Sequence, residues 1–389
     1  LEGRFVDTPK RRMDDAAGAF AASGFGTRGL PDAPVANNDD VNAANTALLD
    51  VGDEIWALWE AGSPYRIDPA DLSARGPVTF RNDLRHMPFS AHPKVEPGGR
   101  VWNFGLAYGR PSSIIWALAP DGSLERAELI DLPRTSYLHD WAVSETKLIF
   151  PLQPWVSARQ RPPFVTSLKW RPEDGMQILV VDKDDFSKRR IFDAPAAFFF
   201  HTGDAYEERD GTIRFDACFG DGPVLGPEDG ARIVRGLPLT GPTAQMAAMT
   251  LRPDGTVRYE RTGEPAEFPV TDRRRQGRAH GAVWSVTEDG AVGDAPYTFN
   301  GVMRTDWNSG GVDRFFFGAD RLAEEHVFVP RPGATGERDG WLVGAWLNVA
   351  ERATELAVFD AARLADGPLA VWRSDVALPI GFHGLWRGA

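Results

Sequence analysis

The sequence predicts an all-β fold, and the spacing of its turns is typical of a β-propeller. Short runs of β-branched and aromatic residues alternate with turn signals along most of the chain. Asp-Gly pairs recur at intervals close to the length of a four-stranded propeller blade. Helical patterns are scarce.

The predicted elements are separated by turn signals. The first is a short helix expected over Asp14–Ala22, with Gly24 near its end. The clearest strands are expected over 147–150, 177–181 and 212–215, because each is rich in β-branched or aromatic residues and lies next to a turn signal. No Gly/Ser-rich linker divides the chain, so we expect residues 1–389 to form a single domain.

The spacing of the turns indicates the length of the repeating unit. Asp-Gly pairs begin at Asp121, Asp174, Asp210, Asp254, Asp289, Asp339 and Asp366, so that successive pairs lie 53, 36, 44, 35, 50 and 27 residues apart. A propeller blade of four strands takes about 40–45 residues. The pairs at 221 and 229 are set aside, because they fall in a Gly/Pro-rich stretch that we interpret as one long loop. A pair of β-sandwiches would also contain many such hairpins, and turn spacing alone leaves that alternative open.

Charge and composition exclude several classes of function. The chain has 43 basic and 55 acidic residues, a net charge of −12, and no long basic run, which argues against nucleic acid as a partner. No apolar stretch is long enough for a membrane-spanning helix and no signal peptide is visible. The single cysteine, Cys218, allows neither an internal disulfide nor a cysteine metal site, so we expect a reducing, cytoplasmic compartment.

Four of the seven histidines stand in distinctive contexts. His92 lies in Ser-Ala-His-Pro-Lys, His139 begins His-Asp-Trp-Ala-Val, His201 follows three phenylalanines, and His383 lies in Gly-Phe-His-Gly-Leu. Intervals of 47, 62 and 182 residues separate them, unlike the short intervals of zinc fingers. They are of blade size or larger, so one inward strand per blade would bring the rings together at a propeller axis. His86, His280 and His326 are interpreted as ordinary residues.

These contexts, together with further segments in the same order along the chain, resemble the carotenoid cleavage oxygenase family. The supporting segments are Asn45–Ala47, Ala57–Gly62, Pro64–Pro69, Glu267–Pro269 and Val327–Gly333. The resemblance implies a seven-bladed β-propeller with a cap of loops and helices over the active-site face. The stretch Arg4–Lys10 looks like a point well inside the family sequence. We therefore expect an N-terminal segment that completes one blade and part of the pocket to be missing, and an inactive or fragmentary member stays an alternative.

The resemblance also implies a metal centre. In the family, four histidines bind Fe(2+), and these match His92, His139, His201 and His383. Three glutamates that orient the imidazoles match Glu60, Glu267 and Glu325, expected to pair with His139, His201 and His383 respectively. Four neutral imidazoles suit iron and leave two octahedral positions open. Thr46 matches a family threonine whose methyl group lies close to one open position.

The implied reaction is cleavage of a conjugated C=C bond by O₂ to give two carbonyl products. Trp59 stands where stilbene-cleaving relatives have a lysine, which favours a carotenoid or apocarotenoid as the apolar conjugated substrate. The candidate pocket aromatics are Trp59, Phe104, Trp141, Phe200, Phe268 and Phe382. Such substrates partition into membranes, so we also expect peripheral membrane contact, for which 20–22 and Phe25 are candidates unless they pack in the core.

Two other functions stay open on the sequence alone. One is a dioxygenase that cleaves stilbenes or other phenylpropanoids on the same scaffold. The other is a non-catalytic propeller that binds a ligand or a partner, with the histidines as structural residues or as a closed, tetrahedral zinc site.

Overall fold

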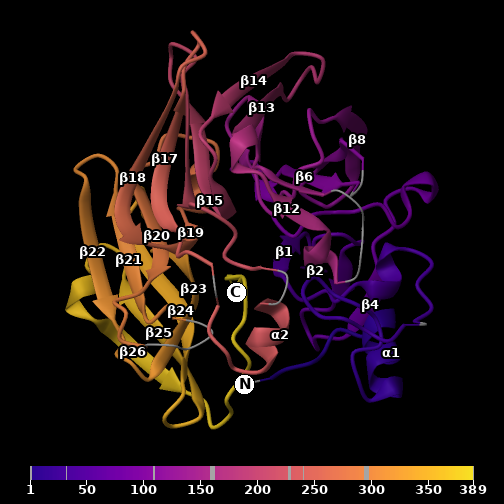
Figure 1. The fold of residues 1–389 in the computed structure, drawn as a ribbon. Coiled ribbons are helices and arrows are strands. Elements are labelled where there is room, and N and C mark those ends of the chain that lie inside the picture. The colour runs from indigo at the N-terminus through magenta and orange to yellow at the C-terminus, as the bar shows by residue number, and fades with distance from the viewer. Residues whose placement is uncertain are drawn as a thin grey trace.

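Six antiparallel sheets of four strands each are arranged around a central axis in the computed structural model (Figure 1). The structure describes residues 2–31, 33–107, 110–157, 163–226, 229–239, 241–292 and 298–388. The arrangement is a β-propeller, which confirms the all-β prediction and excludes the pair of β-sandwiches. The expected strands over 147–150 and 177–181 lie in β10 and β13, and the one expected over 212–215 begins one residue before β16.

Each sheet is built from strands that pair antiparallel in chain order, interrupted only in the third sheet by a separate hairpin, β11 (Trp155–Ser157) and β12 (Leu168–Trp170). The first three sheets contain β1 (Ala47–Val51), β2 (Glu54–Leu58), β3 (Tyr65–Ile67) and β4 (Ala74–Pro77); β5 (Lys94–Val95), β6 (Val101–Leu106), β7 (Ser112–Leu118) and β8 (Leu124–Asp131); and β9 (Ala142–Val143), β10 (Lys147–Leu152), β13 (Met176–Asp182) and β14 (Arg189–Ala194). The last three contain β15 (Phe198–Glu207), β16 (Ile213–Gly220), β17 (Gln245–Leu251) and β18 (Val257–Pro265); β19 (Glu267–Val270), β20 (Ala282–Thr287), β21 (Gly301–Asp306) and β22 (Gly311–Phe316); and β23 (Arg321–Pro330), β24 (Gly340–Asn348), β25 (Ala353–Asp360) and β26 (Pro368–Arg373).

Helices are few and short. The first, α1 (Pro9–Ala17), begins and ends five residues before the predicted span, because Thr8 caps its start, Pro9 favours its first turn and Gly18 ends it with a left-handed φ of 60°. The second, α2 (Asp229–Val234), lies in the stretch that the sequence suggested was loop. The remaining helical turns are the 3₁₀ segments η1 (Asn38–Val41), η2 (Asn82–Leu84), η3 (Phe164–Ser167), η4 (Pro172–Asp174), η5 (Arg273–Arg275) and η6 (Leu364–Asp366). Among the described residues, no helix has the length and apolar character needed to cross a membrane.

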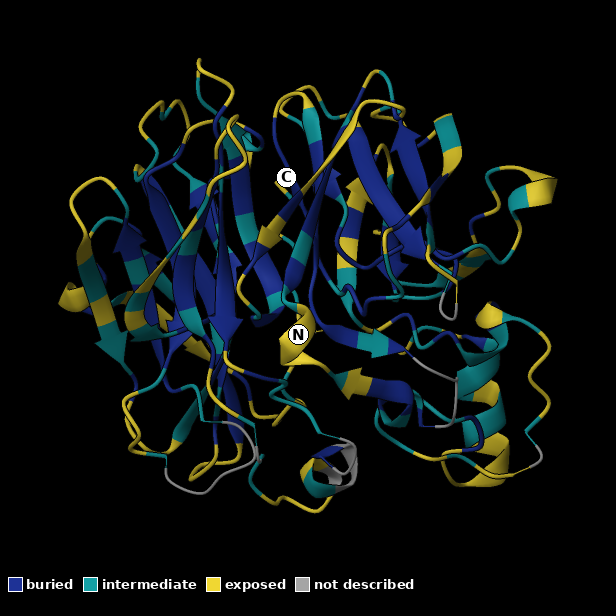
Figure 2. Ribbon diagram, turned by 45° about the horizontal axis from the view of Figure 1, so that its top comes forward, coloured by how far each residue is buried: buried dark blue, intermediate teal, exposed yellow. Residues whose placement is uncertain are grey.

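Buried aromatic side chains join neighbouring sheets. Trp284 of β20 stacks on Phe328 of β23 with ring centroids 4.7 Å apart, and its Nε1 donates to the carbonyl of Ala361 at 3.0 Å. These contacts tie the fifth sheet to the sixth. Figure 2 shows the same pattern throughout, with buried residues in the strands and exposed residues mainly in the loops between them.

The expected number of seven blades is wrong for the part of the chain that the structure describes, which has six four-stranded sheets. The described residues before β1 contain only α1 and η1, and the C-terminal tail, residues 374–388, contains no strand. The tail runs from the last sheet to the first and bonds to both: Leu378 N donates to Thr354 Oγ1 at 2.8 Å, and His383 N donates to Thr46 O at 3.3 Å. Because these bonds go to single groups and not to a continuous neighbouring strand, the tail links the two sheets without forming one.

A cap of loops and short elements packs beside the end of β15. Phe25, from the loop after α1, lies 5.5 Å from the Tyr137 ring, 6.3 Å from Trp155 of β11 and 5.9 Å from Phe164 of η3. Phe25 therefore belongs to the packed interior of the cap, and of the proposed membrane-contact residues only Phe20 is exposed.

Candidate metal centre

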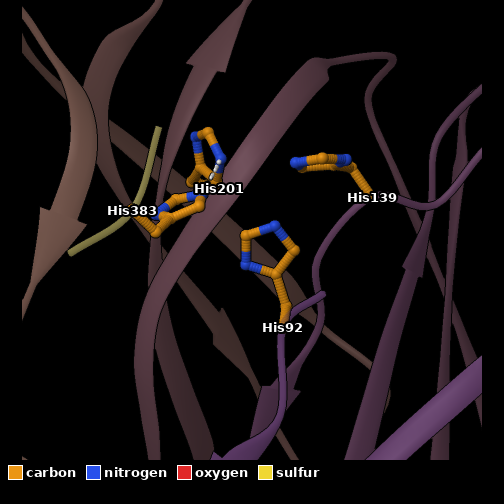
Figure 3. A group of neighbouring side chains, drawn as sticks. All are labelled: His92, His139, His201 and His383. Atoms are coloured by element: carbon orange, nitrogen blue, oxygen red, sulfur yellow. Dashed lines mark hydrogen bonds between the residues drawn. The ribbon is translucent and has the colours of Figure 1, made fainter. Parts of the chain in front are cut away.

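The four singled-out histidines meet at one point although they lie on separate segments (Figure 3). His92 and His139 lie in the coils that lead into β5 and β9, whereas His201 lies within β15 and His383 lies on the C-terminal tail. A nitrogen atom from each ring lies within 4.8 Å of the nitrogens of the other three. The structure therefore brings together the four rings that the sequence motifs singled out.

Two of the rings face each other through their Nε2 atoms. His201 Nε2 and His383 Nε2 point toward each other (Figure 3) and lie 3.1 Å apart. The Nδ1 atoms of both rings lie against carboxylates. An Nδ1 that donates its proton to a carboxylate leaves Nε2 with a free lone pair. Two lone pairs at this distance repel unless a proton or a cation lies between them. This pair of nitrogens fits a metal ion.

His92 supplies the second observation that fits a metal. Its Nε2 is buried and has no hydrogen-bond partner among the described residues, which is costly for a polar atom. The ring lies 4.5 Å from the His139 ring and 4.8 Å from the His383 ring, measured between centroids. The unpartnered lone pair is therefore surrounded by the other three histidines.

Three glutamates contact the Nδ1 atoms of three of the rings. Glu60, after β2, places Oε2 2.8 Å from His139 Nδ1. Glu267, the first residue of β19, places Oε2 2.5 Å from His201 Nδ1 and accepts the Phe268 N–H at 2.8 Å. Glu325, at a register shift in β23, places Oε1 2.8 Å from His383 Nδ1 and accepts the Gly384 N–H at 2.8 Å. These contacts fix the orientation of three imidazoles.

Burial controls the charge of the centre. It holds the pKa of His92 and of His201 well below the usual range, and the neighbouring histidines lower both further. Both rings are therefore neutral, the form that binds metals. Burial raises the pKa of Glu267 to about 7. Burial also acts to raise the pKa of Glu325, but His383 and the Gly384 N–H outweigh it and hold that pKa below its usual value.

Some of the other predicted site residues lie beside the histidines, whereas the rest lie in the core or are exposed. Phe268 stacks on His201 with centroids 4.8 Å apart, Phe200 lies 5.3 Å from His139, and Thr46 accepts the His383 N–H through its carbonyl. Phe104 and Trp141 are buried in the core between the second and third sheets. Trp59 is partly exposed, one residue before Glu60, and Phe382 on the tail is 51% exposed.

Sequence reasoning missed Tyr137, which lies beside the centre. Its hydroxyl donates to Glu60 Oε2 at 2.8 Å and lies 3.1 Å from His139 Nδ1. Its place two residues before His139 was the available signal, because alternate residues of an extended segment share one side.

The remaining histidines lie outside the cluster. His86 contacts Asp39 and His280 contacts Asp216, at 2.7 and 3.0 Å. His326 Nδ1 lies 2.8 Å from the Glu324 carbonyl. A polar cavity of about 150 Å³ lies beyond the ends of β5 and β9, lined by Glu96 and Lys183 among others, so it is not the space between the four histidines.

Comparison with known proteins places the chain among oxygenases. The family model described as retinal pigment epithelial membrane protein matches residues 1–388. The apocarotenoid-15,15'-oxygenase of Synechocystis sp. is 28% identical over 363 residues, covering 89% of this chain and 73% of that protein. The resveratrol cleavage oxygenase 1 of Aspergillus fumigatus is 24% identical, covering 89% and 74%. The crystal structure of cobalt-substituted Synechocystis apocarotenoid oxygenase matches the fold with a TM-score of 0.87 at 24% identity, over 99% of this chain and 84% of that one.

Proposed function

Because this chain belongs to the retinal pigment epithelial membrane protein family, the family of the carotenoid cleavage oxygenases, we propose that it is an Fe(II) dioxygenase that cleaves a conjugated C=C bond of an apocarotenoid or carotenoid. The single observation that carries the proposal is the convergence of four histidine nitrogens within 4.8 Å of one another. Four neutral nitrogen donors suit iron and leave coordination positions free.

The histidines and the glutamates have different roles at the centre. His92, His139, His201 and His383 hold the metal through their ring nitrogens. Glu60, Glu267 and Glu325 keep the proton on Nδ1 of their partner rings, so that Nε2 faces the metal. Iron(II), when bound, supplies the activation of O₂ that the reaction needs. The reaction needs no acid or base from the protein, so no side chain has to move a proton to or from the substrate.

The substrate assignment rests on the lining of the centre and on the relatives. Phe200 and Phe268 contact His139 and His201 and offer apolar surface beside the metal position. Trp59 directly precedes Glu60, and its role in the proposal is to offer an aromatic surface to the substrate where a lysine would favour a phenol. Thr46 accepts the His383 N–H through its carbonyl, and its role in the proposal is to restrict one open coordination position with its methyl group. The similarity to an apocarotenoid oxygenase supports the polyene substrate over a stilbene, although resveratrol and isoeugenol oxygenases are also relatives.

Two measurements test the proposed function. Protein purified without oxygen is expected to contain about one iron per chain, whereas zinc or no metal would overturn the iron assignment. The iron-loaded protein is expected to convert an apocarotenal and ¹⁸O₂ into two carbonyl products that both carry the label. Cleavage of resveratrol with no turnover of any apocarotenoid would refute the substrate class and leave the metal centre in place.

The setting of the enzyme is part of the proposal. We propose that residues 1–389 act as one domain in the cytoplasm, with the cap in peripheral contact with a membrane that holds the substrate. Phe20 is 54% exposed and offers an apolar side chain that suits insertion into a lipid surface. Sedimentation with anionic vesicles is expected to recover wild-type protein and less of Phe20→Ser, and equal recovery would contradict this contact.

A further inference from the structure

We infer that Asp140 is a positioning residue that fixes three of the four histidine-bearing segments relative to one another, an inference that rests on the proposed metal centre. Asp140 follows His139 directly and is 1% exposed. Its carboxylate reaches the segments of His92 and His201 as well as its own. It lies in the His-Asp-Trp-Ala-Val motif that begins at His139, but the motif assigned it no role.

The link to the His201 segment runs through Thr202. Asp140 Oδ2 accepts the Thr202 N–H at 2.8 Å and lies 2.8 Å from the Thr202 hydroxyl. That hydroxyl also lies 2.7 Å from the Trp141 carbonyl. Because Thr202 follows His201, these bonds fix the backbone of β15 at the point where the ligand projects.

The link to the His92 segment runs through Lys94. The Lys94 ammonium lies 2.9 Å from Asp140 Oδ1, and Trp141 Nε1 donates to the His92 carbonyl at 3.0 Å. Lys94 is itself buried, and its Nζ lies 3.3 Å from the Thr202 hydroxyl. Asp140, Lys94 and Thr202 therefore form one buried network that joins the three segments.

The same carboxylate faces the one ring that has no glutamate partner. Asp140 Oδ1 lies 3.8 Å from His92 Nδ1, beyond hydrogen-bond distance, because Lys94 and the Trp141 N–H occupy that oxygen. The orientation of His92 is thus set through its backbone and through neighbouring charges. The positive charge of Lys94 offsets the negative charge of Asp140. The network therefore positions the ligands without adding net negative charge to that of the three glutamates.

A matched pair of aspartates separates positioning from a general effect of buried charge. Asp204 is also 1% exposed, lies on the same strand as His201 and accepts the N–H groups of Ala205 and Gly277, at 2.7 and 3.2 Å. None of its bonds reaches a histidine of the centre. Asp204→Asn therefore replaces a buried acidic side chain whose bonds lie outside the network.

The test measures binding of Co(II) by chelator competition and the visible absorption of bound cobalt, in wild type, Asp140→Asn, Thr202→Val and Asp204→Asn. Asp140→Asn is expected to lower cobalt affinity about 10- to 100-fold, the range typical of residues behind metal ligands, and to alter the cobalt spectrum. Thr202→Val is expected to change both in the same direction by less, and it keeps the test decisive if Asp140→Asn does not fold. Asp204→Asn is expected to keep the wild-type affinity and spectrum.

The outcomes distinguish the two levels of the argument. Wild-type protein that binds neither cobalt nor iron would refute the metal centre itself. A wild type that binds cobalt, with Asp140→Asn or its substitute Thr202→Val unchanged in affinity and spectrum, would overturn the role of Asp140 alone. Equal losses in Asp140→Asn and Asp204→Asn would also overturn it.

Discussion

Replacement of Glu325 by glutamine is expected to loosen the fourth histidine from the centre. Unlike the other three ligands, His383 lies on the C-terminal tail, whose described residues form no strand. Glu325 holds the tail there with both carboxylate oxygens, one 2.8 Å from His383 Nδ1 and the other 2.8 Å from Gly384 N. The tail is otherwise held by a few bonds such as the one from His383 N to Thr46 O.

The magnitude follows from the number of bonds affected. Glutamine offers one oxygen where the glutamate offers two, so one bond is lost and the other no longer has a charged acceptor. A hydrogen bond to a charged group contributes about 1.5–3 kcal/mol. Since about 1.4 kcal/mol corresponds to a factor of ten in binding, metal affinity should fall about 10- to 100-fold.

The neighbouring residue provides the control. Glu324 is also partly buried and accepts the N–H of Gly381 on the same tail, but it touches no ligand ring. Metal affinity, measured by anaerobic chelator competition, is expected to fall in Glu325→Gln and to stay within about threefold of wild type in Glu324→Gln. Trypsin should also cleave the tail of metal-loaded Glu325→Gln faster than that of wild type. Wild-type affinity in Glu325→Gln, or equal losses in both variants, would refute this reasoning.

Three further predictions concern pH, stability and substrate. Burial acts to lower the pKa of His280, but Asp216 outweighs it and raises that pKa to about 9 from the usual 6.5. The stabilisation by this pair should be fully present below about pH 6.5 and lost as the pH rises through about 9. The denaturant midpoint of wild type should therefore fall across this pH window more than that of His280→Gln. Parallel curves for the two proteins would contradict the pairing. Trp284→Ala should lower the free energy of unfolding by about 3–5 kcal/mol in urea titrations, because it leaves a cavity between two sheets and an unpaired Ala361 carbonyl. A loss below about 1 kcal/mol would show that the sheets repack. Trp59→Ala should reduce kcat/KM for an apocarotenal without reducing bound iron, and loss of iron would instead indicate that Trp59 supports Glu60.

Much of the architecture was predictable because it is encoded locally. Residues 147–150 and 177–181 form strands as predicted, and they pair with each other as β10 and β13. The helix near the N-terminus was predicted five residues too late, since its alanine-rich end resembles helix whereas its true limits are set by the caps Thr8 and Gly18. The short helix α2 was missed because the surrounding glycines and prolines indicate loop.

The sheet count and the contacts around the centre could not be predicted in the same way. The described residues form six four-stranded sheets where seven were expected, and the tail contacts the first and last sheets without adding a strand to either. Tyr137 and Asp140 were not singled out, since an aromatic and an acidic residue beside a histidine have many ordinary roles. Their importance depends on Glu60 and Thr202, which lie 77 and 62 residues away along the chain.

The sequence by itself determined the class of this protein: an all-β chain whose four histidine motifs and three glutamates match one family of oxygenases. Those features are local, since a strand, a turn or a motif depends on residues within a few positions of one another. Only the tertiary structure decided that the four rings meet within 4.8 Å, that two of them face each other through Nε2, and that Asp140 joins three of their segments. The physical reason is that these distances depend on how whole sheets pack around the axis, and packing joins residues that no sequence interval brings together.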